Sequence, residues 1–148
     1  MIKPRLHAAP PNMNCAATAL WAITGKFKED IERLIRQTSG DSSWTASPEK
    51  TAHPSDWIKA LEELGYKTKK VDTELIPIEQ FMSKKGISDD AILVSSCDTA
   101  GKHPDHVFAT QGKSYVDCCT HGEIREFKKV SDELKDFKVK YLVELWLP

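Results

Sequence analysis

Three features that would place a protein in a class at once are missing from this sequence: a long apolar run, a surplus of charge and an internal repeat. No apolar run approaches the roughly 20 residues that span a bilayer, and the opening stretch MIKPRLHAAPPN contains no apolar core as long as a signal peptide requires. The 21 basic and 22 acidic residues give a formal net charge of -1, so there is no electrostatic case for a nucleic acid or a membrane as partner. We expect a cytoplasmic protein with no nucleic-acid and no membrane partner.

The chain has 148 residues, of which 40% are hydrophobic. That is enough for a proper apolar core, and we expect residues 1–148 to form a single domain. We expect the four cysteines to lie in a reducing cytosol. Cysteines there are more often free thiols, catalytic groups or metal ligands than partners in a disulfide.

Apolar residues recur three and four apart in the first half of the chain, and alternate or run together in the second half. The pattern predicts helices at residues 15–24, 28–40, 56–65 and 76–86, strands at 66–72, 91–96 and 138–148, and a hairpin at 106–117. Because helices come first and an antiparallel sheet follows, the predicted fold class is α+β. The polar stretch 41–55 is a loop of unusual length, and such loops are often lids or binding segments.

The stretch PPNMNCAATALWAITG, residues 10–25, places Cys15 at the first turn of a predicted helix. Asn14 is a good N-cap there, and Gly25 suits the position after the last turn. A thiol at a helix N-terminus lies near the positive end of the helix dipole and near unpaired amides, and both favour the nucleophilic thiolate. The alternative is that Cys15 is a small buried apolar residue that fills a gap.

A nucleophilic thiolate needs a base, and His106 opens a predicted hairpin that also carries Asp117. With a two-residue turn at Gln111–Gly112, His106 lies opposite Asp117, and their Cβ atoms are about 4.5–5.5 Å apart. A slip of one residue would still leave Asp117 on the neighbouring diagonal. A carboxylate in this place orients an imidazole. The alternative is an exposed His–Asp pair at a sheet edge.

A thiol on the first helix, followed by a histidine and an aspartate on adjacent strands, resembles the arrangement in papain-like cysteine peptidases. HVFATQGKSYVDCCTHG is similar to the histidine strand, turn and aspartate strand of the bacteriocin-processing peptidase domains on double-glycine transporters. NCAATALWAITG is similar to the nucleophile helix of those domains and of small papain-like proteins common in bacteriophage genomes. The resemblance implies Cys15 as nucleophile, His106 as base and acid, and Asp117 as the orienting carboxylate.

The sequence departs from this family pattern at the oxyanion donor. These families usually have a glutamine several residues before the cysteine, whereas Ala9 stands six residues before Cys15. Asn12 and Asn14 are the candidates to replace it, and we favour Asn12 because Asn14 is also needed as the helix cap.

Zinc binding is the rival chemistry, since six cysteines and histidines gather within 25 residues: Cys97, His103, His106, Cys118, Cys119 and His121. The paired spacings typical of zinc sites are absent, and two successive cysteines on a strand point to opposite faces. We therefore expect no metal and no cofactor. His103 is the alternative base to His106.

The predicted function is a cysteine hydrolase that cleaves a peptide, isopeptide or related acyl bond of a protein or peptide substrate through Cys15, His106 and Asp117. The alternative is a catalytically silent papain-like protein, of a phage or effector type, that binds or inhibits a protein partner. The enzyme needs an activated thiol and an open groove, and the binding protein needs neither. The sequence does not fix the oligomeric state.

Overall fold

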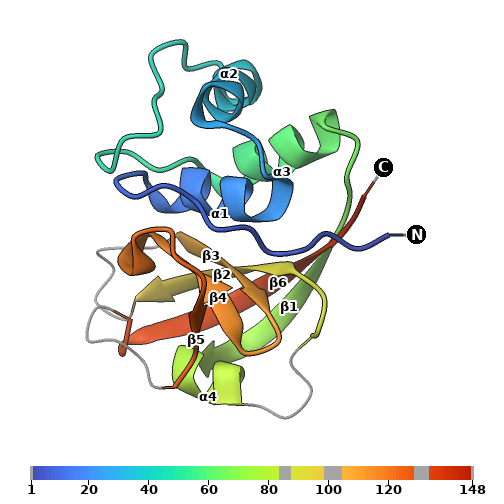
Figure 1. Cartoon of the computed structure of the whole chain (residues 1–148), viewed down its shortest axis with the longest axis vertical. Helices are drawn as coiled ribbons and strands as arrows, with labels where there is room; N and C mark the ends of the chain where they lie inside the picture. The colour runs from blue at the N-terminus through green and yellow to red at the C-terminus, as the bar shows by residue number, and fades with distance from the viewer. Residues whose placement is uncertain (1, 84–87, 99–104, 129–133, 148) are drawn as a thin grey trace.

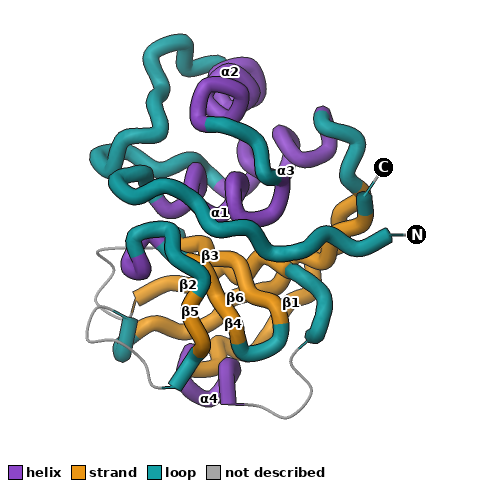
Figure 2. Tube along the Cα trace, viewed as in Figure 1, coloured by secondary structure: helices purple, strands orange, loops and turns teal. Residues whose placement is uncertain are grey.

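The computed structural model describes residues 2–83, 88–98, 105–128 and 134–147. The helices in this part of the chain are α1 (Cys15–Thr24), α2 (Lys28–Ser39), α3 (Pro54–Glu63) and α4 (Ile78–Ser83). The strands are β1 (Lys67–Pro77), β2 (Ile92–Asp98), β3 (His106–Gln111), β4 (Ser114–Val116), β5 (Arg125–Glu126) and β6 (Phe137–Trp146), with a 3-10 helix, η1 (Cys118–Thr120), after β4. Helices α1, α2 and α3 cover one side of the sheet, and α4 lies on the other (Figures 1 and 2). The fold class is α+β, as the sequence predicts.

The sheet is antiparallel and has the strand order β1-β6-β2-β3-β4-β5. Strand β6 lies between β1 and β2, so Val143 pairs with Lys70 on one side and with Leu93 on the other. The two ends of the chain lie close together (Figure 1), where the amide of Leu147 donates to the carbonyl of Ile2 over 2.8 Å. The last strand of the chain is therefore an interior strand of the sheet, next to the edge strand β1.

Alternate residues of the central strands face two separate apolar cores. In β2, Leu93 joins the cluster beneath α1, α2 and α3, whereas Ile92 and Val94 join a second cluster that includes Phe81 and Met82 of α4. Successive side chains of a strand point to opposite faces, so the continuous apolar run that predicts β2 is that of a strand buried on both sides. Helix α1 buries eight of its ten residues, so the helix that carries Cys15 is enclosed by its neighbours.

The turn between β3 and β4 differs from the predicted one. Gln111 pairs with Ser114, so the turn residues are Gly112–Lys113 and not Gln111–Gly112. Gly112 has a φ of 59° in the first turn position, which is the position that needs a positive φ in a type II′ turn. Its amide donates to the carbonyl of Ser88 over 2.8 Å, so a distant segment of the chain favours this register.

The segment after β4 is also different from the prediction. Cys118 and Cys119 lie in η1 and not on a strand, so the argument that they point to opposite faces of a sheet is wrong. Asp117 caps η1 by accepting a hydrogen bond of 2.7 Å from the amide of Cys118. Thr120 completes a capping box, because its hydroxyl oxygen accepts from the amide of Asp117 over 3.1 Å.

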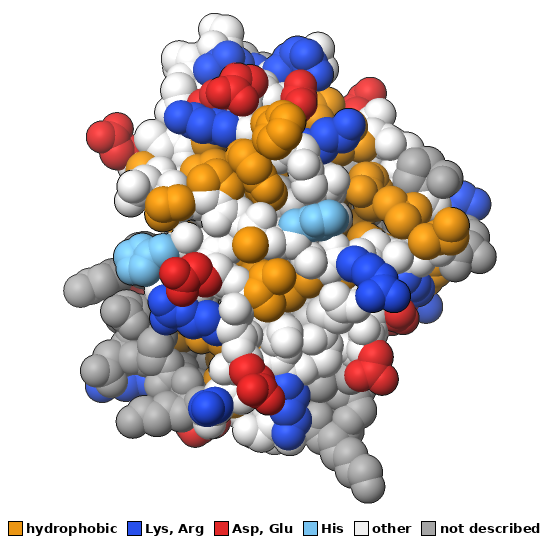
Figure 3. Space-filling model, viewed as in Figure 1, with side chains coloured by type: hydrophobic (Ala, Val, Ile, Leu, Met, Phe, Trp, Pro, Cys, Tyr) orange, Lys and Arg blue, Asp and Glu red, His pale blue; other side chains and the backbone are white. Residues whose placement is uncertain are grey.

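The surface carries both signs of charge. On the face seen in Figure 3, the side chains of Lys and Arg are interspersed with those of Asp and Glu. This distribution agrees with a formal net charge of -1. Within the residues that the structure describes, we find no helix with the length and apolar content needed to cross a bilayer.

Asn14 connects the start of α1 to the long loop between α2 and α3. Its Oδ1 accepts from the amide of Ala17 over 2.9 Å, which is the predicted N-cap. Its Nδ2 donates to the carbonyls of Thr45, Ser47 and Lys50 over 3.3, 3.0 and 2.9 Å. One buried amide side chain therefore fixes both the helix and the loop.

We expect Asn14→Ala to lower the free energy of unfolding by about 2–3 kcal/mol: about 1 kcal/mol from the cap and the rest from loop carbonyls left without a donor. Urea denaturation followed by circular dichroism measures the change. Asn12→Gly is the matched control, since Asn12 is exposed and has a φ of 66°, which glycine adopts without strain. We expect the free energy of unfolding of this variant to be nearly unchanged. A loss of only about 1 kcal/mol in Asn14→Ala would show that the loop bonds contribute nothing.

Candidate active site

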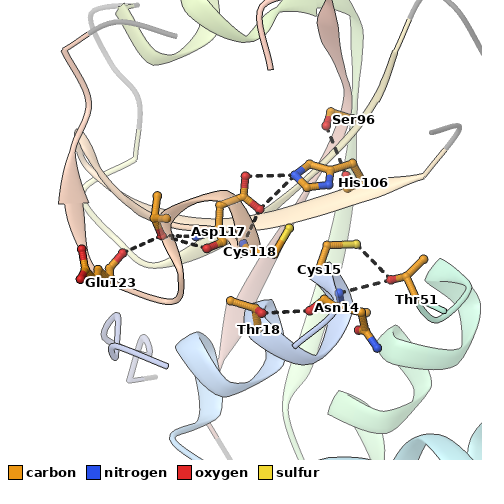
Figure 4. A network of polar contacts seen from close by, with 11 residues as sticks. Asn14, Cys15, Thr18, Thr51, Ser96, His106, Asp117, Cys118 and Glu123 are labelled. Carbon is orange, nitrogen blue, oxygen red and sulfur yellow. Dashed lines mark hydrogen bonds and ion pairs between the residues drawn. The ribbon is translucent and has the colours of Figure 1, made fainter. Parts of the chain in front are cut away.

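The predicted nucleophile lies in a cleft of about 590 Å³, at the N-terminus of α1. Its lining includes Asn12, Cys15, Thr51, His106 and Cys118, which come from the approach to α1, the long loop, β3 and η1. Segments far apart in the sequence therefore meet here. Figure 4 shows Cys15 and Thr51 on the helical side of this site, facing His106, Asp117 and Cys118 on the sheet side.

Cys15 is 8% exposed, and its thiol lies among polar groups. Its Sγ lies 3.0 Å from Oγ1 of Thr51. Burial raises the pKa of the thiol, but a side-chain hydrogen bond with His106, the charge of His106 and the bond with Thr51 outweigh it, and the pKa is lowered from its ordinary value. These contacts therefore stabilise the thiolate of Cys15 relative to that of an ordinary cysteine.

His106 and Asp117 form a buried ion pair at the start of β3. Nε2 of His106 lies 3.0 Å from Oδ1 and 3.1 Å from Oδ2 of Asp117. In the observed register, Asp117 lies diagonally across from His106 and not directly opposite it. The predicted turn is therefore wrong by one residue, whereas the predicted proximity of the two side chains is correct. With Nε2 directed at the carboxylate, Nδ1 is the ring nitrogen that can exchange a proton with Cys15.

His106 and Asp117 each shift the pKa of the other toward the charged form. Burial lowers the pKa of His106, but the charge of Asp117 and the hydrogen bond to it, together with Cys15, raise the pKa well above its ordinary value. Burial raises the pKa of Asp117, but the charge and hydrogen bond of His106 and the bond from Cys118 lower it below its ordinary value. Each charge of the pair therefore favours the charged form of its partner.

These shifts make folding stability depend on pH. The raised pKa of His106 gives a contribution that is complete below its ordinary value of 6.5 and is lost as the pH rises through the folded-state value. The lowered pKa of Asp117 gives a contribution that is present above its ordinary value of 3.8 and is lost as the pH falls through the folded-state value. Both contributions to stability are therefore complete between pH 3.8 and pH 6.5.

The structure separates the two candidate oxyanion donors. Nδ2 of Asn14 is directed at loop carbonyls, so Asn14 is occupied as cap and clamp. Asn12 is exposed, has a φ of 66° and lines the cleft. Ala9, in the position where the families that the sequence resembles have glutamine, donates its amide to the carbonyl of Gly122 over 2.8 Å.

The rival zinc ligands are only partly brought together. Among the described residues, donor atoms of His106, Asp117 and Cys118 lie within 4.8 Å of one another. Of these three, the sequence-based set included His106 and Cys118, and the structure adds Asp117. His103, the alternative base and another member of the predicted zinc set, lies outside the described residues. The four cysteines, all described, form no disulfide.

Thr51 is the contact that the sequence did not reveal. Its Oγ1 accepts from the amide of Ala16 over 3.3 Å and touches the sulfur of Cys15. The only signal for it was the length of the loop, which predicted a binding segment without indicating which residue would reach the helix.

Comparison with solved structures identifies the fold of this chain. No family model matches the chain, and no curated protein matches it. Among solved structures, it is similar to the peptidase domain of Streptococcus ComA, a bi-functional ABC transporter involved in a quorum sensing pathway, with a TM-score of 0.56 and 11% identity over 97% of this chain and 98% of that chain. The peptidase domain of Streptococcus mutans ComA gives a TM-score of 0.52 and 11% identity over 96% and 98%. The chain therefore has the papain-like peptidase fold that the sequence resemblance predicts.

We expect Asp117→Asn to lower the pKa of His106, because the variant removes the charge that opposes the effect of burial. Titration of the imidazole signals by NMR measures the midpoint. Asp105→Asn is the matched control: Asp105 precedes His106 and pairs with Lys140 over 3.1 Å, so we expect it to leave the midpoint nearly unchanged. An unchanged midpoint in Asp117→Asn would contradict the described ion pair.

Proposed function

We propose that this protein is a cysteine hydrolase in which Cys15 is the nucleophile, His106 the base and acid, and Asp117 the orienting carboxylate. The proposal rests on one observation: the three side chains lie together at one cleft. Cys15, whose pKa is lowered, and His106 line this cleft, and His106 forms a buried ion pair with Asp117. A nucleophile, a base and a group that orients the base are the three parts that covalent catalysis of this kind requires.

The first half of the proposed reaction forms a thioester. The thiolate of Cys15 attacks the carbonyl carbon of the scissile bond, an S–C bond forms, and the carbonyl oxygen becomes an oxyanion. The imidazolium of His106 then gives its proton to the leaving nitrogen as the C–N bond breaks. Asp117 keeps the imidazole in the orientation in which Nδ1 faces the reacting atoms.

The second half hydrolyses the thioester. His106, now neutral, takes a proton from a water molecule, and the hydroxide attacks the thioester carbon. The C–S bond breaks, the acid is released, and the thiolate and imidazolium are restored. No cofactor enters either half. The cleft is lined from Asn12 to Phe137, so we propose that residues 1–148 act as one unit.

Two donors are proposed for the oxyanion. The amides of Ala16, Ala17 and Thr18 are paired with Thr51 or Asn14. Within the described part of the chain, the amide of Cys15 has no such bond, which supports it as one donor. Asn12 is the proposed second donor, since it lines the cleft and Asn14 is occupied.

A protein or peptide is the proposed substrate, and its peptide, isopeptide or related acyl bond the proposed target. The support is the likeness to two peptidase domains. The second candidate is a silent papain-like protein that binds a protein partner. Two observations favour that candidate: Ala9 stands where related enzymes have glutamine, and Cys15 is only 8% exposed.

We expect Cys15 to be alkylated much faster than Cys97, Cys118 or Cys119 at about pH 6, because an ordinary thiol with a pKa of about 8.5 is almost fully protonated there. A short iodoacetamide pulse followed by peptide mass spectrometry measures the four rates. We expect His106→Ala to slow the labelling of Cys15, since it removes the cation that favours the thiolate.

Turnover separates the two candidates. An internally quenched peptide library should be cleaved by the native protein and not by Cys15→Ala. Once circular dichroism has shown that Cys15→Ala is folded, this variant also serves as a trap for copurifying substrates. Equal labelling of all accessible cysteines, together with no cleavage, would favour the silent binding protein.

We expect Asn12→Ala to reduce turnover of any cleaved peptide by roughly a hundredfold or more, the effect of losing one oxyanion donor. Labelling of Cys15 should be unchanged, because alkylation forms no oxyanion. Peptide turnover and the labelling pulse are measured on the same preparation. Loss of turnover in folded Asn14→Ala, with normal turnover in Asn12→Ala, would mean that the roles of the two asparagines are reversed.

A further inference from the structure

Thr51 lies at the end of the long loop and reaches the predicted nucleophile from the side opposite the imidazole (Figure 4). Its Oγ1 lies 3.0 Å from Sγ of Cys15 and 3.3 Å from the amide nitrogen of Ala16. We propose that Thr51 is a positioning residue, whose hydroxyl donates its hydrogen to the sulfur of Cys15 and holds the thiolate in place. This inference rests on the proposed function, because it concerns the same nucleophile.

The direction of the hydrogen bond follows from the donors available. The amide of Ala16 can only donate, so it uses a lone pair of the Thr51 hydroxyl oxygen. The hydroxyl keeps one hydrogen to donate, and the sulfur of Cys15 lies within reach of it. A thiolate has no hydrogen of its own, so the bond to it is a hydroxyl donating to a negative charge, which is stronger than a bond between neutral groups.

The loop holds this hydroxyl in a fixed position. The side-chain amide of Asn14 donates to the carbonyls of Ser47 and Lys50, just before Thr51 in the chain. Ala52, just after it, is 6% exposed and belongs to the main core. Because both neighbours are fixed, little conformational entropy is lost when the hydroxyl meets the thiolate.

Thr51 and His106 act on the sulfur in different ways. His106 supplies charge and exchanges a proton, whereas Thr51 has an ordinary hydroxyl that stays protonated. Loss of Thr51 should therefore change how readily the thiol ionises without removing the base. A threonine that only supports the loop would have no such effect, so the ionisation profile of Cys15 distinguishes the two roles.

The test compares Thr51→Val, Thr51→Ser and Thr45→Val with the native protein. Valine keeps the shape of threonine and removes the hydroxyl, and serine restores the hydroxyl. Thr45 is the matched control: it is an exposed threonine of the same loop, whose Oγ1 contacts Ser47. The rate of Cys15 alkylation by iodoacetamide is measured as a function of pH, after circular dichroism has shown that each variant is folded.

We expect Thr51→Val to move the midpoint of the alkylation profile to higher pH and to slow alkylation about tenfold at about pH 6, the effect of losing one hydrogen bond to a charged group. Thr51→Ser should restore most of the native profile, and Thr45→Val should leave it unchanged. If Thr51→Val does not fold, Thr51→Ala is measured with the same expectation.

A native profile in the hydroxyl-free variant would overturn the inference, and so would an equal shift in Thr45→Val. These outcomes differ from failure of the proposed function. A native protein that cleaves no peptide in the quenched library, yet shows the shift in Thr51→Val, would refute hydrolysis and support the bond to Thr51. A native protein that cleaves peptides while Thr51→Val keeps the native profile would support hydrolysis and refute the role of Thr51.

Discussion

The site depends on one buried side chain, Asn14, which satisfies two groups of polar atoms at once. Its oxygen caps α1 and its nitrogen holds the carbonyls of the loop that follows α2. A helix N-terminus and a loop are both rich in backbone groups that need partners. Because one amide serves both, a short chain of hydrogen bonds through Asn14 helps to fix the position of Cys15 relative to Thr51, in addition to the packing of the loop against the core.

The buried pair of His106 and Asp117 shows how a charge is kept away from water. The side chain of Asp117 is 0% exposed, and removing a carboxylate from water is costly unless other polar groups compensate. His106 and the amide of Cys118 supply that compensation. The same bonds that make burial tolerable also fix the ring of His106, so the stability of the pair and its orientation have one cause.

Around the proposed nucleophile, opposite effects of burial and charge decide the protonation states. Burial alone would leave both Cys15 and His106 neutral. The carboxylate of Asp117 reverses this for the imidazole, and the imidazolium in turn reverses it for the thiol. By contrast, the hydrogen bond with Cys119, burial and the charge of Asp117 raise the pKa of Cys118. Cys15 and Cys118 therefore line one cleft with pKa values shifted in opposite directions.

Features that depend on residues close together in the chain could be predicted from the sequence. The cap at Asn14, the helix behind Cys15 and the closeness of His106 and Asp117 follow from residues a few positions apart, or from two strands joined by a tight turn. Even there, the turn lies one residue later than predicted, and a hydrogen bond between Gly112 and the distant Ser88 supports the observed register. Thr51 contacts Cys15 although 36 positions separate them in the sequence, and Cys118 and Cys119 lie in η1. Neither feature could be predicted without the tertiary structure. Such contacts depend on how α1, the long loop and the sheet pack together, and no spacing along the chain encodes that packing.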